Sequence, residues 1–172
     1  MMSWLIIRIQ GVLSAIQRGE ISGDDVARSF LTIARVAEED MGGTSGALHA
    51  IYFAALAQQL QHFATTADIT KKDWSIALSG ALDRLYTYTR ARPPSRTLVD
   101  PLAAFTDALS REAGSFEDAV TAAAHATERT KNLEAMAGRS VYLEGERLKE
   151  LQVADPGAWG VKVRAVYMVS VL

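Results

Sequence analysis

The segment best suited to chemistry is a glycine-rich turn at residues 41–46, with the sequence Met-Gly-Gly-Thr-Ser-Gly. Glycines directly before a helix leave backbone N–H groups open to a ligand, and the helix start adds about half a positive charge. The hydroxyls of Thr44 and Ser45 would add two donors. This combination suits phosphate binding, although the Gly-Lys-Ser/Thr ending of a P-loop is missing. The alternative, from spacing alone, is a tight turn in which Thr44 or Ser45 caps the helix.

A second candidate is the proline-stiffened loop at residues 90–100, which carries three arginines around Pro93 and Pro94. Such a loop could hold phosphates or cover a nucleotide, because each guanidinium offers a fork of donors. The alternative is a solvated loop in which Arg90, Arg92 and Arg96 pair with nearby acids. Taken alone, the loop favours this second interpretation.

Two short motifs near the C-terminal end form a third candidate. In residues 138–140, Gly-Arg-Ser, the fork of Arg139 could reach across a site to a phosphate or a purine face. Residues 155–158 read Asp-Pro-Gly-Ala, which is also ordinary chemistry for starting a helix. Each motif alone is weak evidence for a ligand.

Other reactive residue types give little support for a catalytic or metal site. The three histidines lack the spacing of a metal site, so we interpret them as structural or exposed: His49, His62 and His125. The acidic run at residues 38–40 could hold Mg²⁺ but is more typical of a solvated helix end. No Gly-x-Ser-x-Gly motif occurs, and the absence of cysteine excludes disulfides and thiolate zinc sites.

The composition describes one ordinary globular domain spanning residues 1–172. Hydrophobic residues make up 49% and charged residues 22%, and the formal net charge of -2 gives no basic excess for nucleic acid or an anionic membrane. The apolar stretch at residues 4–16 is interrupted by Arg8 and Gln10 and is shorter than the roughly 20 residues that a membrane span needs. These features, with the lack of cysteine, predict a cytoplasmic protein without a membrane span.

The elements that must position these motifs are helices, because apolar residues recur with a helical period almost throughout. A Ser22 cap is expected to start the second helix, Thr70 with Asp73 the fourth, and Ser115 the sixth. Residues 138–154 have no clear period. The pattern predicts an all-α, antiparallel barrel or bundle of about seven amphipathic helices. The first lies at about 4–18, the second runs from the Ser22 cap through Ala37, and the third runs from residue 44 or 45 through 60. The others lie at about 71–85, 100–113, 116–136 and 156–172.

The order of the motifs is more specific than any one of them. Residues 41–48, 91–100, 138–142 and 155–158 occur in the order and spacing of one family. The chain therefore resembles the ATP-binding C-terminal domain of dihydroxyacetone (glycerone) kinases, or the separate ATP- or ADP-binding subunit of bacterial systems. The resemblance extends from about Gly11 to the end.

This resemblance implies a helical barrel with ATP or ADP at one end. It assigns the phosphates to the Gly-Gly-Thr-Ser turn, the adenine to Leu98 and closure over the nucleotide to Arg139, while the Asp-Pro-Gly turn completes the pocket. The nucleotide-binding residues implied are Gly43, Thr44, Ser45, Leu98, Arg139, Asp155, Pro156 and Gly157.

One departure from the family concerns the metal. The family places three aspartates, which hold two Mg²⁺ ions, between its first and second helices. This sequence begins in what resembles the second helix, and Asp24 and Asp25 follow that helix without matching the motif. The resemblance thus implies a barrel without its first helix and without the Mg²⁺ ligands, and it leaves the catalytic residues unassigned.

The function expected from the resemblance is phosphoryl transfer from ATP to dihydroxyacetone, with a dihydroxyacetone-binding kinase domain or subunit as the partner. Without metal ligands, we expect the chain alone to be inactive or nearly so. The alternative is a non-catalytic nucleotide- or protein-binding module derived from that domain. A homodimer and an ancestry among relatives that release cyclic FMN stay open.

Overall fold

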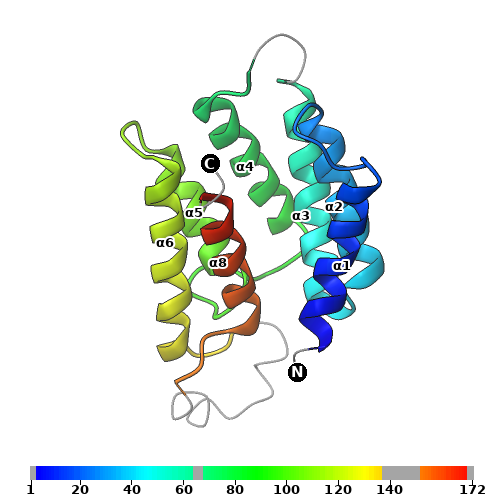
Figure 1. Cartoon of the computed structure of the whole chain (residues 1–172). Helices are drawn as coiled ribbons and strands as arrows, with labels where there is room; N and C mark the ends of the chain where they lie inside the picture. The colour runs from blue at the N-terminus through cyan, green and yellow to red at the C-terminus, as the bar shows by residue number, and fades with distance from the viewer. Residues whose placement is uncertain (1–2, 64–67, 137–151, 170–172) are drawn as a thin grey trace. The chain divides into compact units, whose positions relative to one another are not determined.

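The structure is a computed structural model that describes residues 3–63, 68–136 and 152–169. Every regular element in these three ranges is a helix, so the predicted all-α class is confirmed (Figure 1). The chain divides into two compact units, residues 1–88 and residues 89–172. None of the described helices combines the length and apolar character needed to cross a membrane.

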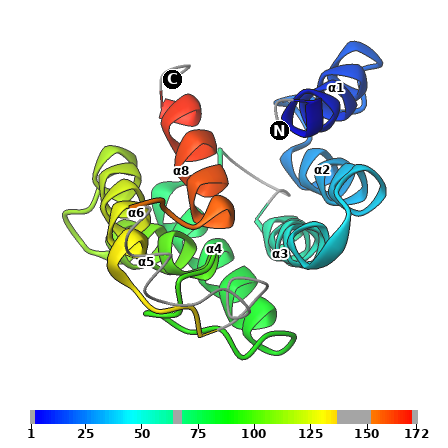
Figure 2. The ribbon, with the colours of Figure 1, turned by 90° about the horizontal axis from the view of Figure 1, so that it is seen from below.

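The first unit contains α1 (Ser3–Gln17), α2 (Val26–Asp40), α3 (Gly43–Gln61) and α4 (Lys71–Tyr86). Each helix packs against the next one in the chain, and α1, α2 and α3 lie side by side (Figure 2). Small residues at the contacts let the helix axes approach closely. The buried apolar side chains include Ala34, Ala37, Tyr52, Ala55, Leu56, Leu60, Ala77, Leu78, Ala81, Leu82 and Leu85.

An aromatic cluster joins three of these helices. The ring of Phe30 on α2 lies 5.9 Å from that of Phe53 on α3 and 5.9 Å from that of Trp74 on α4. Aromatic pairs at this separation stabilise a core beyond the area they bury. The cluster therefore fixes α2 and α3, whose connection is the glycine-rich turn.

The starts of α2 and α4 show one wrong and one correct prediction. Asp25, rather than Ser22, caps α2, because its carboxylate accepts from the N–H of Arg28 at 2.9 Å. Ser22 is engaged elsewhere, since its N–H donates to the hydroxyl of Ser29 and its carbonyl accepts from that hydroxyl. The capping box of Thr70 with Asp73 at α4 is confirmed.

The second unit contains α5 (Val99–Ser110), α6 (Phe116–Arg129), a 3₁₀ turn η1 (Thr130–Asn132) and α8 (Pro156–Val169). Helix α6 packs between α5 and α8, and Ser115 with Asp118 forms the expected capping box at its start. The buried apolar side chains include Val99, Ala108, Leu109, Ala119, Ala123, Ala126, Ala158, Val161 and Ala165.

Two predicted helix ends in this unit were wrong. Helix α5 ends at Ser110 rather than near Ala113, because Arg111 is extended with φ −67° and ψ 145°. Helix α6 ends at Arg129 rather than near Met136, because η1 follows it and Leu133 is extended. Most of the expected irregular stretch 138–154, and the predicted helix end at 172, lie outside the described residues.

Candidate functional site

The glycine-rich turn forms the start of α3. Gly42 is the N-cap residue in extended conformation, and Gly43 opens the helix with φ +73°, in the left-handed region that favours glycine. A Cβ built on Gly46 would lie only 1.6 Å from the carbonyl oxygen of Met41. Both positions therefore require glycine if the chain is to enter α3 in this way.

This helix start has no side-chain cap. Thr44 and Ser45 lie inside the first turn, so the alternative in which one of them caps α3 is not realised. The first N–H groups of a helix have no acceptor within the helix, and they carry its positive end. Thr44 is exposed and Ser45 half-buried, so an anion could reach this helix start from the solvent.

A buried histidine supports the turn from one helical turn further on. His49 is 5% exposed, and its Nδ1 lies 2.7 Å from the carbonyl oxygen of Ser45, to which it donates. Its ring lies 6.1 Å from the ring of Phe53. His62 and His125 are exposed. The interpretation of the histidines as structural or exposed agrees with these positions.

A cavity of about 1060 Å³ runs along α2 and α3 and reaches Gly42 and Gly43. Its charged lining includes Arg28, Arg35 and Glu20, and a nitrogen of Arg35 lies 2.6 Å from a carboxylate oxygen of Glu20. This volume would admit a ligand of nucleotide size. Its apolar lining consists of Leu31, Ala34, Met41, Ala47, Ala50, Ile51 and Ala54.

The acidic run at residues 38–40 lies exposed at the end of α2. Across residues 3–63, 68–136 and 152–169, no group of three or more His, Cys, Asp or Glu side chains could hold a metal ion. The described residues therefore do not fit a Mg²⁺ site of the usual carboxylate type.

In the second unit, a buried carboxylate organises the arginine-rich loop. Asp100 accepts from the N–H of Ser95 at 3.0 Å and from the N–H of Thr97 at 2.8 Å. Only 5% of Asp100 is exposed. These bonds to a charged acceptor fix the backbone on both sides of Arg96 and lead it into α5.

The arginines of this loop bond to the backbone. Arg92 is exposed and donates to the carbonyls of Thr89 and Ala91. Arg96 is 2% exposed and donates from its Nε to the carbonyl of Thr130 at 3.0 Å. The prediction of Arg96 as an exposed loop residue, whether free for phosphate or paired with an acid, was therefore wrong. Arg90 is exposed, and its role stays a prediction.

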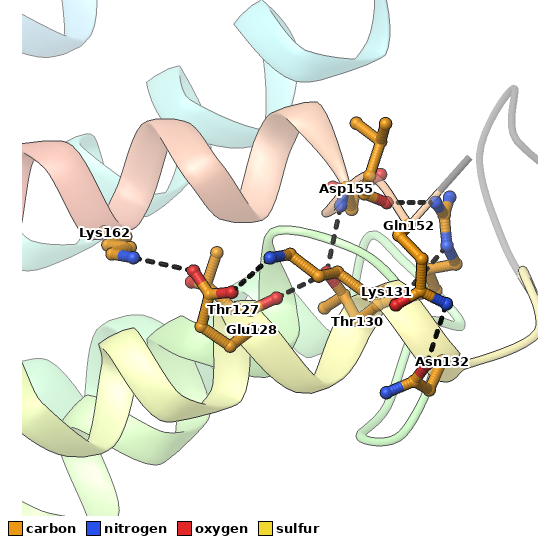
Figure 3. Close-up of polar contacts among 10 residues, drawn as sticks. Thr127, Glu128, Thr130, Lys131, Asn132, Gln152, Asp155 and Lys162 are labelled. Carbon is orange, nitrogen blue, oxygen red and sulfur yellow. Dashed lines mark hydrogen bonds and ion pairs between the residues drawn. The ribbon is translucent and has the colours of Figure 1, made fainter. Parts of the chain in front are cut away.

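The Asp-Pro-Gly motif starts α8 as the capping interpretation predicted. The Oδ1 of Asp155 accepts from the N–H of Ala158 at 2.9 Å. The N–H of Asp155 donates to the hydroxyl of Thr130 at 2.9 Å (Figure 3). Burial raises the pKa of the Asp155 carboxyl above its ordinary value, although the bond from Ala158 and the charge of Arg96 act in the opposite direction. This carboxyl is therefore already engaged within the protein.

Leu98 lies directly against this helix start. A Cβ built on Gly157 would lie 3.2 Å from the Cβ of Leu98, so the missing side chain of Gly157 leaves room for the leucine. Leu98 is 5% exposed, whereas Pro156 is exposed and Gly157 half-buried. The surface offered to a ligand here is thus that of Pro156 and Gly157, with Leu98 behind it.

The structure thus forms two groups from the predicted site residues. Gly43, Thr44 and Ser45 lie together in the first unit, and the second unit brings residue 98 against residues 155–157. Arg139 lies outside the described residues. Sequence reasoning missed Thr130, whose partners are 25 and 34 residues away in the chain, a separation at which no local pattern could signal a contact.

Comparison with known proteins relates this geometry to one family. The family described as the DAK2 domain matches residues 8–169. Dihydroxyacetone kinase 2 of Saccharomyces cerevisiae is 39% identical over 151 residues, which cover 86% of this chain and 25% of that protein. Triokinase/FMN cyclase of Homo sapiens is 37% identical over 127 residues, covering 70% of this chain and 21% of that protein. The resemblance predicted from the four motifs is confirmed.

Solved structures show the same fold. The crystal structure of the dihydroxyacetone kinase from C. freundii in complex with AMP-PNP and Mg²⁺ superposes with a TM-score of 0.73 and 22% identity, covering 99% of this chain and 28% of that chain. The native form of that enzyme gives a TM-score of 0.74 at 23% identity. At this identity the likeness concerns the fold alone. The chain spans about a quarter of the length of the yeast relatives it matches.

Proposed function

This chain belongs to the DAK2 domain family, and we propose that it binds ATP or ADP as the phosphoryl-transfer domain of a dihydroxyacetone kinase. The observation that carries the proposal is the start of α3, where a glycine at φ +73° opens a helix that has no side-chain cap. Free N–H donors at the positive end of a helix are a common phosphate site.

The phosphate side of the proposed site uses backbone and hydroxyl donors. The N–H groups of Gly43, Thr44 and Ser45 would bind the terminal phosphates, with the two hydroxyls adding donors of adjustable direction. Hydrogen bonds to a charged acceptor are stronger than neutral ones, so a few donors suffice. His49 holds the carbonyl of Ser45 from below and so supports the turn without touching the ligand.

The nucleoside side of the site would use the start of α8. Pro156 and Gly157 offer a small, weakly polar surface backed by Leu98, which suits the face of a base or a ribose. Asp155 holds this surface in place because its carboxylate caps α8. The family resemblance adds Arg139 as a residue that closes over the nucleotide.

The chemistry assigned to this chain is binding and orientation. Phosphoryl transfer depends mainly on positioning and on neutralising charge at the phosphates. Mg²⁺ would supply much of that neutralisation, and the described residues do not fit a site for it. The acceptor, dihydroxyacetone, would be bound by a separate kinase domain or subunit, as the family resemblance implies.

Nucleotide binding is tested by titrating ADP into the protein, with and without Mg²⁺, by calorimetry. The double variant Thr44→Ala/Ser45→Ala should bind ADP about 10- to 100-fold more weakly, since it removes two donors to a charged group. The control Thr44→Ser/Ser45→Thr keeps both hydroxyls and should bind within about threefold of the wild type. Equal ADP affinity in all three proteins would refute the phosphate site.

Transfer is tested separately with the dihydroxyacetone-binding domain of the yeast relative added in excess. ATP-dependent phosphorylation of dihydroxyacetone that needs both proteins would support the kinase assignment. ADP binding without any transfer in this mixture would replace it with the alternative of a non-catalytic nucleotide-binding module.

A further inference from the structure

Arg96 differs from the other arginines of its loop in burial and in bonding. It is 2% exposed, and its backbone adopts φ +57°, a left-handed conformation that costs a non-glycine residue roughly 1 kcal/mol or more. Burying a guanidinium is also costly unless its donors are satisfied. Two unfavourable features at one residue indicate that its position is held by strong interactions.

These interactions are hydrogen bonds to the backbone of two distant segments. The Nε of Arg96 donates to the carbonyl of Thr130 at 3.0 Å, and its Nη2 donates to the carbonyl of Val153 at 2.9 Å. Thr130 begins the turn after α6, and Val153 lies two residues before the cap of α8. One rigid side chain therefore links the arginine loop to both segments.

The hydroxyl of Thr130 completes this junction (Figure 3). It accepts from the N–H of Asp155 at 2.9 Å and donates to the carbonyl of Thr127 at 2.6 Å. Thr127 in turn donates to the carbonyl of Ala158 in the first turn of α8. Thr127 and Thr130 thus join the end of α6 to the start of α8, and Thr130 also accepts the bond from Arg96.

The junction determines where Leu98 meets α8. Leu98 follows Arg96 by two residues, and its Cβ would lie 3.2 Å from a Cβ on Gly157. We name Leu98, Pro156 and Gly157 the base platform. We infer that Arg96 is a positioning residue that holds the base platform together without touching the nucleotide, an inference that rests on the proposed function.

This assignment predicts that a substitution at Arg96 affects the binding of two ligands differently. The base platform would contact the nucleoside, whereas the family resemblance assigns the phosphates to the Gly-Gly-Thr-Ser turn, which the base platform does not include. A substitution at Arg96 should therefore weaken the binding of ADP and leave the binding of inorganic pyrophosphate unchanged. If Arg96 instead contacted the phosphates directly, its substitution would weaken the binding of both ADP and pyrophosphate. A general loss of folded protein would also weaken both.

The test compares the dissociation constants of ADP and pyrophosphate for the wild type and Arg96→Lys. Lysine keeps the charge but cannot form both bonds of the fork. We expect about a tenfold weaker ADP affinity, with pyrophosphate affinity changed by less than about twofold. Arg111→Lys, at an exposed arginine of the same unit, is the matched control and should change neither constant.

Leu109→Ala controls for lost stability, because it opens a cavity in the same core outside the base platform. Measured where all variants are folded, it should bind ADP like the wild type. If Arg96→Lys does not fold, Thr130→Val tests the same junction at its other bond, since it removes the hydroxyl that binds the N–H of Asp155 and keeps the carbonyl that accepts from Arg96.

Equal weakening of both ligands, or unchanged ADP affinity, would overturn the positioning role of Arg96. A loss of ADP affinity in Leu109→Ala as large as in Arg96→Lys would do the same. Failure of the wild type to bind either ligand would instead refute the proposed function itself, and this inference with it.

Discussion

Two helix starts, that of α3 in the first unit and that of α8 in the second, differ in how their N–H groups are satisfied. Helix α3 begins at Gly43 without any side-chain cap, whereas α8 begins with the carboxylate of Asp155 bonded to the N–H of Ala158. An uncapped start leaves donors for a ligand, and a start capped by its own carboxylate presents negative charge instead. Of the two, the start of α3 is therefore the better suited to bind an anion.

The capping boxes of α4 and α6 show what an ordinary helix start looks like in this protein. Thr70 and Ser115 each accept from the N–H three residues on, and the aspartate there bonds back. The hydroxyls lower the pKa of Asp73 and Asp118, whereas burial raises that of Asp155. The start of α3 thus differs from the capped starts of α2, α4, α6 and α8, and it shares the lack of a side-chain cap with α5.

The largest effect is expected from Gly46→Ala in α3. The new Cβ would meet the backbone carbonyl of Met41 at 1.6 Å, so the turn must move, and we expect a loss of about 3 kcal/mol or more in the free energy of unfolding. Gly160→Ala in α8 is the matched control, because nothing lies within 4 Å of its Cβ. It should stabilise the protein by up to about 1 kcal/mol.

Urea denaturation followed by circular dichroism measures both glycine variants. Similar unfolding free energies for the two would show that the turn at the start of α3 can relax. In that case its geometry would not be fixed for a ligand, and the contrast with α8 would lose its basis.

An intermediate effect is expected from Asp155→Ala, which removes the cap of α8. Loss of an N-cap costs about 1 kcal/mol. Because burial raises the folded-state pKa of Asp155, its contribution to stability is fully present below the unfolded value of 3.8 and decreases as pH rises through the raised value. The destabilisation by Asp155→Ala should therefore be larger at pH 3.5 than at pH 7.

The destabilisation caused by Asp118→Ala should depend on pH in the opposite direction. The pKa of Asp118 is lowered by the hydroxyl and N–H of Ser115, so its contribution is present above pH 3.8 and is lost as pH falls through the lowered value. Unfolding free energies of both variants and the wild type from pH 3 to 7 decide this point. If the destabilisation by the two variants changed with pH in the same direction, the opposite pKa shifts of Asp155 and Asp118 would be contradicted.

The sequence allowed the helices to be predicted better than the contacts between them. The capping boxes at Thr70 and Ser115 could be predicted because each is contained within four residues. The end of α6 could not, since it depends on bonds of Thr130 to residues that lie far away in the chain. The prediction that Arg96 is exposed was wrong for the same reason, because its burial follows from tertiary packing that a loop sequence does not reveal.

The candidate site shows the same division between local and distant information. The glycine-rich turn was predicted from its residues because a glycine at φ > 0 is a local property. Whether Thr44 or Ser45 caps the helix was left open by the sequence, and the structure shows that neither does. The contact between Leu98 and Gly157 joins positions 59 apart. Only the order of motifs in a related family suggested that these two residues belong together, and the structure supplies the physical contact.

The smallest effect is expected from Glu128→Gln, which tests how firmly α8 is attached to α6. Hydrogen bonds from Lys131 and Lys162 hold the pKa of Glu128 at about 2, and the bond from Lys162 of α8 is 2.7 Å long. The stability from this carboxylate is present above the ordinary value of 4.5 and is lost as pH falls from there towards about 2. Glu128→Gln should thus destabilise the protein at pH 7 less than Asp155→Ala does, and added salt should reduce the loss because the pair is only half-buried and solvent reaches it. Asp107→Asn breaks an exposed pair within α5 alone and is the control, so an equal loss in the two variants would mean that the Glu128–Lys162 pair contributes nothing to holding α8.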